Sequence, residues 1–479
     1  MKSFFSLNAK LFTIIALIII SSNIYSQGTS DALRLGYSSL SSDARALGMG
    51  DSYIGLSDDA GAAFFNPAGF GLIKKMELSA GLSYDNYGNN TSFMGNSSNY
   101  SASATRLNNL SFALPFPTLQ GSLVFAVSYH TTRDFTSALK FDGFNKSSSM
   151  IGSLNNSGSY IPYDLYLTDT NFTTPLNDHL NQSGTITGSG ETHAWTFSGA
   201  IEAYKNLFIG LNLDFSSGSY TNNNKYYEDD LTGYYANTLT DPATPNTKGF
   251  ETFYLNKTLN WDITGWDLKF GMLYELKNAR IGITVQFPRS YSVKERFDVS
   301  GYSQFNTGFS PNLDGSLYSD NVQYDIVTPY ELGAGFSINL SSLILSAQAT
   351  LIDYSQLQFE NADGLSDSYV NDINQSIKDN LRSVINLNLG AEYTIPGVGL
   401  RVRAGYLRQP SAYQGDPSSY DRNYVTGGLG YLADEAVDFD VAYAHGWWND
   451  YGDNYGSNVS RTDQKITVDR VIFSTTYRF

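Results

Sequence analysis

Residue types that could carry out catalysis are few in this chain, and their spacing indicates no reaction. The four histidines are His130, His179, His193 and His445, and none stands in a spacing with serine and an acid that would suggest a hydrolase triad. The G-x-S-x-G motif of lipases and esterases is absent. The chain contains no cysteine, which excludes thiolate nucleophiles, thiolate metal sites and disulfides. We therefore predict a protein that is not an enzyme and that needs no cofactor.

Acidic residues are the next candidates, because carboxylates can bind divalent cations. Glu228, Asp229 and Asp230 are consecutive, but they lack the ordered ligand spacing of a calcium-binding loop. We interpret them as a solvated acidic run and predict no metal site. The net charge of −16 also makes nucleic acid an unfavourable partner.

Two arginines near the C-terminus could bind an anionic group. Arg401 and Arg403 alternate with apolar residues, so both belong to the polar face of a predicted strand. Their guanidinium groups could bind the carboxylate of a ligand. Alternatively, they pair with Asp438 and Asp440, which lie on the polar face of another predicted strand, because charges inside a protein are normally paired.

An apolar segment, GAAFFNPAGF at positions 61–70, precedes the first regular strand pattern. Phe64 and Phe65 within it need burial, either against the protein itself or against an apolar ligand. Both residues are therefore candidate ligand contacts.

The residues that follow predict a tight turn. Asn66 precedes Pro67 and is pushed out of the helical conformation. The Asn66 side chain can close an Asx turn, and Gly69 can adopt a positive φ. We predict a short helix that ends before Pro67, followed by this turn.

The elements that must position these residues begin with an export signal. Lys2 and Lys10 are positive, and an apolar run extends from Leu11 to Ile20. This run is too short to cross a bilayer as a helix, so we predict a signal peptide at residues 1–26. No other window approaches 18 consecutive apolar residues. A mature chain that crosses a membrane must therefore do so as a closed β-barrel.

Alternation of apolar and polar residues dominates the sequence after residue 75. Only 16% of the 479 residues are charged, and 14% are aromatic. Leu207, Ile209 and Leu211, for example, alternate with small or polar residues, which is typical of a strand with one apolar face. The alternation predicts fourteen strands, near 76–84, 106–114, 119–132, 191–204, 206–216, 262–276, 279–289, 328–339, 342–356, 382–394, 399–408, 423–432, 436–447 and 465–479.

The connections between these strands alternate in length. Six are tight turns, and seven are long segments rich in Asn, Ser, Gly and Tyr, such as Asp85–Thr105 and Ser217–Trp261. Short periplasmic turns and long extracellular loops are typical of outer-membrane barrels. We therefore predict an all-β fold at 76–479, a 14-stranded antiparallel transmembrane β-barrel in contact with lipid of the cell outer membrane of a Gram-negative bacterium.

A barrel of this size encloses a lumen that must be closed from within. Residues 27–75 show no long alternation and are rich in Gly, Ala, Ser and Asp. We predict that they fold back into the barrel as a plug, or hatch. Within them, SSDARALGMG predicts a helical turn that Ser42 or Asp43 caps and Gly48 ends.

The segment DDAGAAFFNPAG resembles the N-terminal hatch of the FadL family of outer-membrane transporters of hydrophobic compounds, which includes the TodX type. The shared hatch motif is Asn-Pro-Ala, which falls on Asn66, Pro67 and Ala68 and is followed here by Gly69. Residues 265–291 and much of 400–479 resemble the central hairpin and the C-terminal third of the family. The resemblance thus covers nearly the whole mature chain, except the loops.

The resemblance implies passive uptake of a hydrophobic small molecule, such as a long-chain fatty acid or an aromatic hydrocarbon. The ligand would be caught on the extracellular side, held in a pocket that the hatch helps to form, and released sideways into the membrane. We expect the barrel to act as a monomer. An alternative stays open, because SSDARALGMGD at 41–51 also resembles FadL-like barrels that serve as shuttles in type IX protein secretion.

Overall fold

The structure is a computed structural model that describes residues 28–434, 436–456 and 458–479. The signal peptide predicted at 1–26 lies outside the described residues. The strands are β1 (Glu77–Phe93), β2 (Asn96–Phe116), β3 (Leu123–Asp134), β4 (Ser137–Asn145), β5 (Leu180–Tyr204), β6 (Leu207–Asp229), β7 (Phe250–Glu275), β8 (Ala279–Gln286), β9 (Ser290–Phe305), β10 (Asp320–Val327), β11 (Glu331–Leu340), β12 (Leu343–Asp353), β13 (Gln358–Asp363), β14 (Ser383–Thr394), β15 (Leu400–Gln409), β16 (Arg422–Ala433), β17 (Val437–Asp453) and β18 (Arg461–Arg478).

Short helices lie before the first strand and between some of the others. The α-helices are α2 (Thr29–Gly36), α3 (Ala44–Gly48), α4 (Met150–Asn156), α5 (Ile161–Asp164) and α6 (Asp367–Asn380). The 3-10 helices are η1 (Ala60–Ala63), η2 (Pro67–Leu72), η3 (Pro245–Thr247), η4 (Gly315–Leu317), η5 (Tyr354–Gln356) and η6 (Ser418–Tyr420). Among the described residues, no helix is both long and apolar enough to cross a membrane.

The strands form one closed antiparallel barrel with fourteen strand positions around it, as predicted. Each of these positions is called a stave below, because some of them are occupied by two strands in succession. β1 pairs with both β2 and β18, which closes the barrel. The eighteen strands make fourteen staves because four staves are each broken into two strands: β3 with β4, β8 with β9, β10 with β11, and β12 with β13. Pro288 and Pro329 stand at two of these breaks, where a proline has no N–H to donate to a neighbouring strand.

The two faces of the barrel wall differ in the way that the alternation predicted. On β6, the outward side chains of Leu211 and Phe215 are exposed, whereas the inward Asn212 and Asp214 are buried. Exposed apolar residues on the other staves, among them Leu389 and Phe473, continue this band around the barrel. An apolar outer band with a polar interior is the arrangement of a transmembrane barrel.

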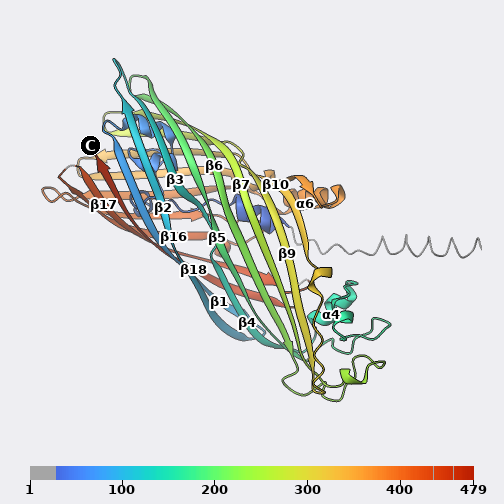
Figure 1. Cartoon of the computed structure of the whole chain (residues 1–479). Coiled ribbons are helices and arrows are strands. Elements are labelled where there is room, and N and C mark those ends of the chain that lie inside the picture. The colour runs from blue at the N-terminus through green and yellow to red at the C-terminus, as the bar shows by residue number, and fades with distance from the viewer. Residues whose placement is uncertain (1–27, 435, 457) are drawn as a thin grey trace, which may run out of the picture.

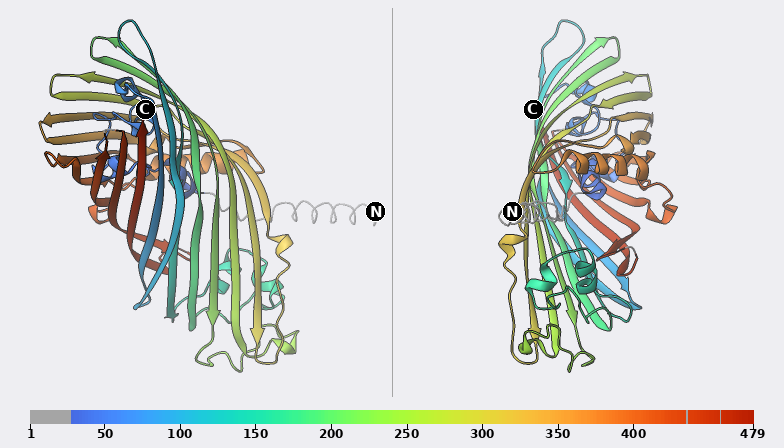
Figure 2. Two further views of the ribbon diagram at one scale, coloured as in Figure 1. Left: turned by 60° about the vertical axis from the view of Figure 1, so that its left-hand side comes forward. Right: turned by 90° about the vertical axis from the view of Figure 1, so that its right-hand side faces the viewer.

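Four of the seven connections predicted as long loops are mostly strand, and this is the part of the fold that was predicted wrongly. In the other three, 133–190, 357–381 and 409–422, most residues lie outside strands, as predicted. β1 and β2 continue through Asp85–Thr105 to a turn at Met94–Gly95, and β6 and β7 continue through most of Ser217–Trp261. Figures 1 and 2 show these strands reaching far from the end of the barrel that holds the plug and the C-terminus. Above the lipid both faces of a strand can be polar, so the apolar alternation stops while the hydrogen-bonded ladder continues.

A loop cap, residues 146–180 with α4 and α5, packs against the inner face of the extended strands (Figure 1). Glu228 lies at the far end of β6, well beyond Phe215 and outside the apolar band, and its side chain is fully buried. Its carboxylate accepts hydrogen bonds from Met150 N at 2.5 Å, Ile151 N at 3.2 Å and Gln182 Nε2 at 2.8 Å. The sequence predicted that the acidic run at 228–230 is solvated, and this is wrong for Glu228. Its buried carboxylate attaches the loop cap to the barrel wall.

The attachment of the loop cap is expected to weaken as the pH rises. Burial raises the pKa of Glu228 from 4.5 to about 7, so the folded cap binds a proton more tightly than the unfolded chain does. The stability that this proton gives to the attached loop cap is fully present below pH 4.5 and is lost as the pH rises to about 7. Hydrogen-exchange protection of α4 should be higher at pH 5 than at pH 8, by on the order of tenfold or more. Glu228→Gln should remove this pH dependence, whereas Glu251→Gln, at an exposed site, should leave it unchanged.

Candidate functional site

The plug, residues 28–75, lies inside the barrel at the end where the chain terminates (Figure 2). Its helical turn is confirmed as α3, and Asp43 is the N-cap because its side chain accepts from Ala46 N at 2.8 Å. The short helix predicted before Pro67 is the 3-10 helix η1, capped by Asp59. A second 3-10 helix, η2, starts at Pro67 and was not predicted.

The Asn66 turn forms as predicted and also joins the plug to the wall. Asn66 Oδ1 accepts from Ala68 N at 3.1 Å, which closes the Asx turn. Asn66 Nδ2 donates to Ile54 O at 2.9 Å within the plug and to Met272 O of β7 at 3.1 Å. The positive φ predicted for Gly69 is wrong. Gly69 is required instead because a Cβ there would overlap the backbone of Ser57.

The plug backbone rests on three pairs of glycines that face each other across neighbouring strands. These glycine seats are Gly210 with Gly271, Gly282 with Gly335, and Gly390 with Gly405. A Cβ at any of the six positions would come within 3.0 Å of plug atoms. These atoms belong to residues 66–68 at the first pair, to Ile54, Gly55 and Asn66 at the second, and to Met49 and Gly50 at the third. The wall thus leaves out side chains where the plug passes, and backbone packs directly on backbone.

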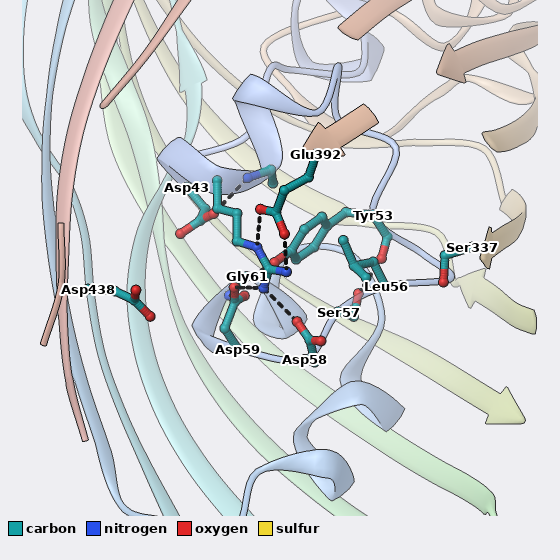
Figure 3. A network of polar contacts seen from close by, with 12 residues as sticks. Asp43, Tyr53, Leu56, Ser57, Asp58, Asp59, Gly61, Ser337, Glu392 and Asp438 are labelled. Atoms are coloured by element: carbon teal, nitrogen blue, oxygen red, sulfur yellow. Dashed lines mark hydrogen bonds and ion pairs between the residues drawn. The ribbon is translucent and has the colours of Figure 1, made fainter. Parts of the chain in front are cut away.

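Arg45, in α3, is the centre of an ion-pair network between plug and wall. It binds Glu392 of β14 through Nε at 3.1 Å and Nη2 at 3.2 Å. Its Nη1 lies 2.6 Å from Asp58 and 3.0 Å from Asp59, both in the plug. Figure 3 shows Asp58, Asp59 and Glu392 converging on this one guanidinium, with Tyr53 beside Asp59. The side chain of Arg45 is only 12% exposed, so the network is shielded from bulk water.

The network continues along the wall through the two arginines that the sequence singled out. Arg403 binds Glu392 and Asp440, each at 2.6 Å, and Arg401 binds Asp438 at 3.0 Å. The pairing with Asp438 and Asp440 that the sequence offered as the alternative is therefore present. Neither arginine lines one of the two cavities described below. A ligand contact for them stays a prediction that the geometry does not support.

A cavity of about 120 Å³, called the lower cavity below, lies between the plug and the barrel wall. Phe64 and Phe65 both line it, and their rings pack edge to face at 5.0 Å. Phe64 also packs against His130 at 5.8 Å, and Lys269 Nζ lies 5.6 Å from the Phe64 ring. The two phenylalanines thus face an enclosed space as well as the protein, and their role as ligand contacts stays a prediction.

A second cavity of about 760 Å³, the upper cavity, lies on the side of the plug away from the end of the barrel where the chain terminates, and α2 forms part of its lining. Arg133 of β3 lines both cavities, as do Ser38 and Ser39 of the plug. Its Nη2 donates to Leu35 O at 2.7 Å and its Nη1 to Ser39 Oγ at 3.2 Å. The sequence did not predict α2 or this cavity. An amphipathic pattern in residues 29–36 was the only signal that could have indicated them.

The barrel wall is interrupted beside the upper cavity. β2 pairs with β3 only from Asn109–His130 to Phe116–Leu123, and β4 pairs with β5. Among the described residues, no ladder pair joins β2 to β4. Phe135 and Thr136, which separate β3 from β4, line the upper cavity. This wall break lies just above the outward-facing Tyr129 and Trp195, close to the upper margin of the apolar band.

Side chains close the wall break where backbone pairing is missing. Arg106 of β2 reaches Asp134 of β3 and Glu191 of β5, each at 2.8 Å. Beyond it, the ring of Phe93 packs on Phe141 of β4 at 5.0 Å. The seam is therefore held by side-chain contacts, which can separate without breaking a strand ladder.

No protein-family model matches the sequence, and no curated protein matches it. Solved structures do share the fold. A Pseudomonas aeruginosa FadL homologue has a TM-score of 0.59 at 14% identity, over 93% of this chain and 100% of that chain. The Pseudomonas putida toluene transporter TodX has a TM-score of 0.54 at 14% identity, over 93% and 99%. The Ralstonia pickettii toluene transporter TbuX has a TM-score of 0.51 at 15% identity, over 93% and 98%. The 14-stranded barrel of this chain therefore has the same fold as these proteins.

Proposed function

We propose that this protein is a passive outer-membrane channel of a Gram-negative bacterium for uptake of hydrophobic compounds, which leave through the wall break. The observation that carries the proposal is the interrupted ladder between β2 and β4 beside the upper cavity. The straight route through the lumen is closed by a plug that glycine seats and the Arg45 network tie to the wall. A compound in the upper cavity therefore has its shortest exit sideways, towards lipid.

The fold supports this proposal through the proteins that share it, two of which are toluene transporters. The physical chemistry agrees, because an apolar compound gains free energy when it leaves water for lipid. No energy source is needed for that transfer. Long-chain fatty acids and aromatic hydrocarbons both fit this route, and we propose that the barrel works as a monomer surrounded by outer-membrane lipid.

The proposal is tested by uptake and by labelling at the wall break. In a host that lacks its own outer-membrane fatty-acid transporter, expression of the protein should raise uptake of radiolabelled oleate or toluene. Thr136→Cys places one thiol at the break in a chain that has no other cysteine. A maleimide dissolved in the bilayer should label this thiol, and a cysteine at the buried inward position Asn212 should stay unlabelled.

Uptake that does not change on expression would reject the transport function. If the protein then co-purified with components of a protein-secretion system, the type IX shuttle alternative would be favoured. Uptake with no labelling of Thr136→Cys from the bilayer would instead reject the sideways route and keep the transport function.

Arg106→Ala is expected to loosen the wall break. The substitution removes the cation that joins β2 to Asp134 and Glu191, and leaves those carboxylates without it at partly buried positions. Hydrogen-exchange protection of β4 should fall by about tenfold, while that of Leu207–Phe215 stays the same. Arg296→Ala is the matched control, because the Arg296–Asp298 pair is exposed and such pairs contribute little. Unchanged protection of β4 would show that the other contacts across the seam, among them Phe93–Phe141 and the hydrogen bond from Asn89 Nδ2 to Ala138 O, hold it without Arg106.

A further inference from the structure

The lining of the upper cavity is unusual for a space that would hold only hydrocarbon. Nine of its lining residues are aromatic, mostly tyrosine, whereas only Leu33, Leu40 and Val468 are aliphatic. The remaining residues are nearly all polar or charged. Apolar ligands are normally held by apolar side chains with a few polar groups. An alkyl chain that filled this cavity would desolvate many polar groups without giving them partners.

One side of the cavity is an aromatic cage around a guanidinium. Arg422, the first residue of β16, lies between two rings, with Cζ at 4.0 Å from the centre of Tyr37 and 5.0 Å from that of Trp448. Trp448 packs in turn against Tyr424 at 6.3 Å and Tyr87 at 6.4 Å. All four aromatic residues line the cavity, and aromatic rings can pack against the C–H face of a sugar ring.

The charged groups of the cavity offer both donors and acceptors. Among the described residues, the Arg422 side chain has no ion pair within 4.0 Å, so its N–H groups are available to a ligand. Asp416 and Asp450 line the same cavity. Among the described residues neither carboxylate has a cationic group within 4.0 Å, and Arg422 is the cation that interacts with Asp450 from further away. A lone carboxylate could bind Arg422 or Arg133, which lines the same cavity. Beside Arg422, however, it would be repelled by these two aspartates. Hydroxyl groups satisfy both, since each one donates and accepts.

We infer that the upper cavity binds a hydroxyl-rich, saccharide-like head group, so that the compound taken up is an amphiphile with such a head. The hydroxyls bind Arg422, Asp416 and Asp450, and the C–H faces pack on Trp448 and Tyr37. The apolar tail then points to the wall break and the lipid. The inference rests on the proposed function, for which it names the substrate class.

The test holds the tail constant and changes the head. The full-length mature protein in lipid nanodiscs is titrated with C12 amphiphiles below their micellar concentrations: dodecyl glucoside, dodecyl galactoside and dodecyl maltoside, against dodecanoate and dodecyldimethylamine oxide. Trp448 faces the cavity and its neighbour Trp447 faces outwards, so each reports on a different side of the wall. At least one glycoside should bind more than tenfold more tightly than either other amphiphile. The fluorescence change should persist in Trp447→Phe and disappear in Trp448→Phe.

Variants of the polar groups complete the test. Arg422→Gln should weaken glycoside binding by roughly ten- to a hundredfold, the usual effect of losing a charge-assisted hydrogen bond. Arg296→Gln, at an exposed site on the outer face, should leave binding unchanged. Dodecanoate binding as tightly as every glycoside, or glycoside binding that ignores Arg422, would overturn the inference. Because binding is measured without transport, absent uptake with intact glycoside binding would reject the proposed function alone.

Discussion

Arg45→Ala is expected to make the barrel leak small polar solutes. The side chain joins Glu392 of the wall to Asp58 and Asp59 of the plug, so its removal leaves three shielded carboxylates with fewer partners. Breaking a buried ion pair in this way typically costs about 3–5 kcal/mol. Swelling of proteoliposomes in small sugars should accelerate severalfold or more over wild type, and a host should become sensitive to bulky hydrophilic antibiotics.

Two further variants separate the role of the network from a general loss of stability. Arg45→Lys keeps the charge but cannot form the bidentate pair with Glu392, so its leak should be intermediate. Arg461→Ala removes an exposed pair with Asp463 and should not leak. If Arg45→Ala migrates as a folded barrel and swells no faster than wild type, the glycine seats and the other plug–wall hydrogen bonds, such as Asn66 to Met272, hold the plug without Arg45.

Gly271→Ala should displace the Asn66 turn, although it adds only one methyl group. The new Cβ would lie well inside 3.0 Å of Asn66 Oδ1 and within 2.8 Å of Pro67 Cδ. Both of these neighbours are themselves held, Asn66 by its bonds to Ile54 and Met272 and Pro67 by its ring, so the strain cannot be relieved by a side-chain rotation. Overpacking of this kind costs about 1–3 kcal/mol. Hydrogen exchange in η2 should accelerate and a solute leak should appear.

Gly427→Ala is the matched control on the same barrel. The nearest atom to a Cβ at position 427 is Arg403 O at 3.8 Å, an ordinary contact. This variant should exchange and leak like wild type. Equal behaviour of the two alanine variants would mean that the plug has room to move away from its glycine seats at little cost.

The fourteen staves could be predicted from the sequence because lipid imposes a simple rule on each of them. A strand that crosses the membrane must present apolar residues on every second position, as Leu211 and Phe215 do, and this period is visible in a single stretch of chain. Each predicted strand corresponds to a strand of the barrel. The extensions of β1, β2, β6 and β7 were predicted as loops, because above the lipid the same ladder is compatible with polar residues on both faces.

The Asn66 turn and the α3 cap were also predictable, since both depend on local chemistry within a few residues. The prediction of a positive φ at Gly69 was wrong. Glycine is needed there because the backbone of Ser57, which lies outside the turn, leaves no room for a Cβ. The choice between two roles for Arg401 and Arg403 likewise needed the register of β15 against β16 and β17, which brings Asp438 and Asp440 beside them.

The sequence by itself thus determined the barrel, its number of staves and the presence of a plug, because periodicity and turn chemistry are local properties. Only the tertiary structure decided where the plug is held and where the strand pairing of the wall is interrupted. The glycine seats join Gly210 to Gly271, Gly282 to Gly335 and Gly390 to Gly405, and the Arg45 network joins α3 to β14. These contacts connect residues far apart in the chain, and the wall break at Phe135 is defined by a pairing that does not form. Neither the plug–wall contacts nor the missing strand pairing leaves a periodic pattern in the sequence.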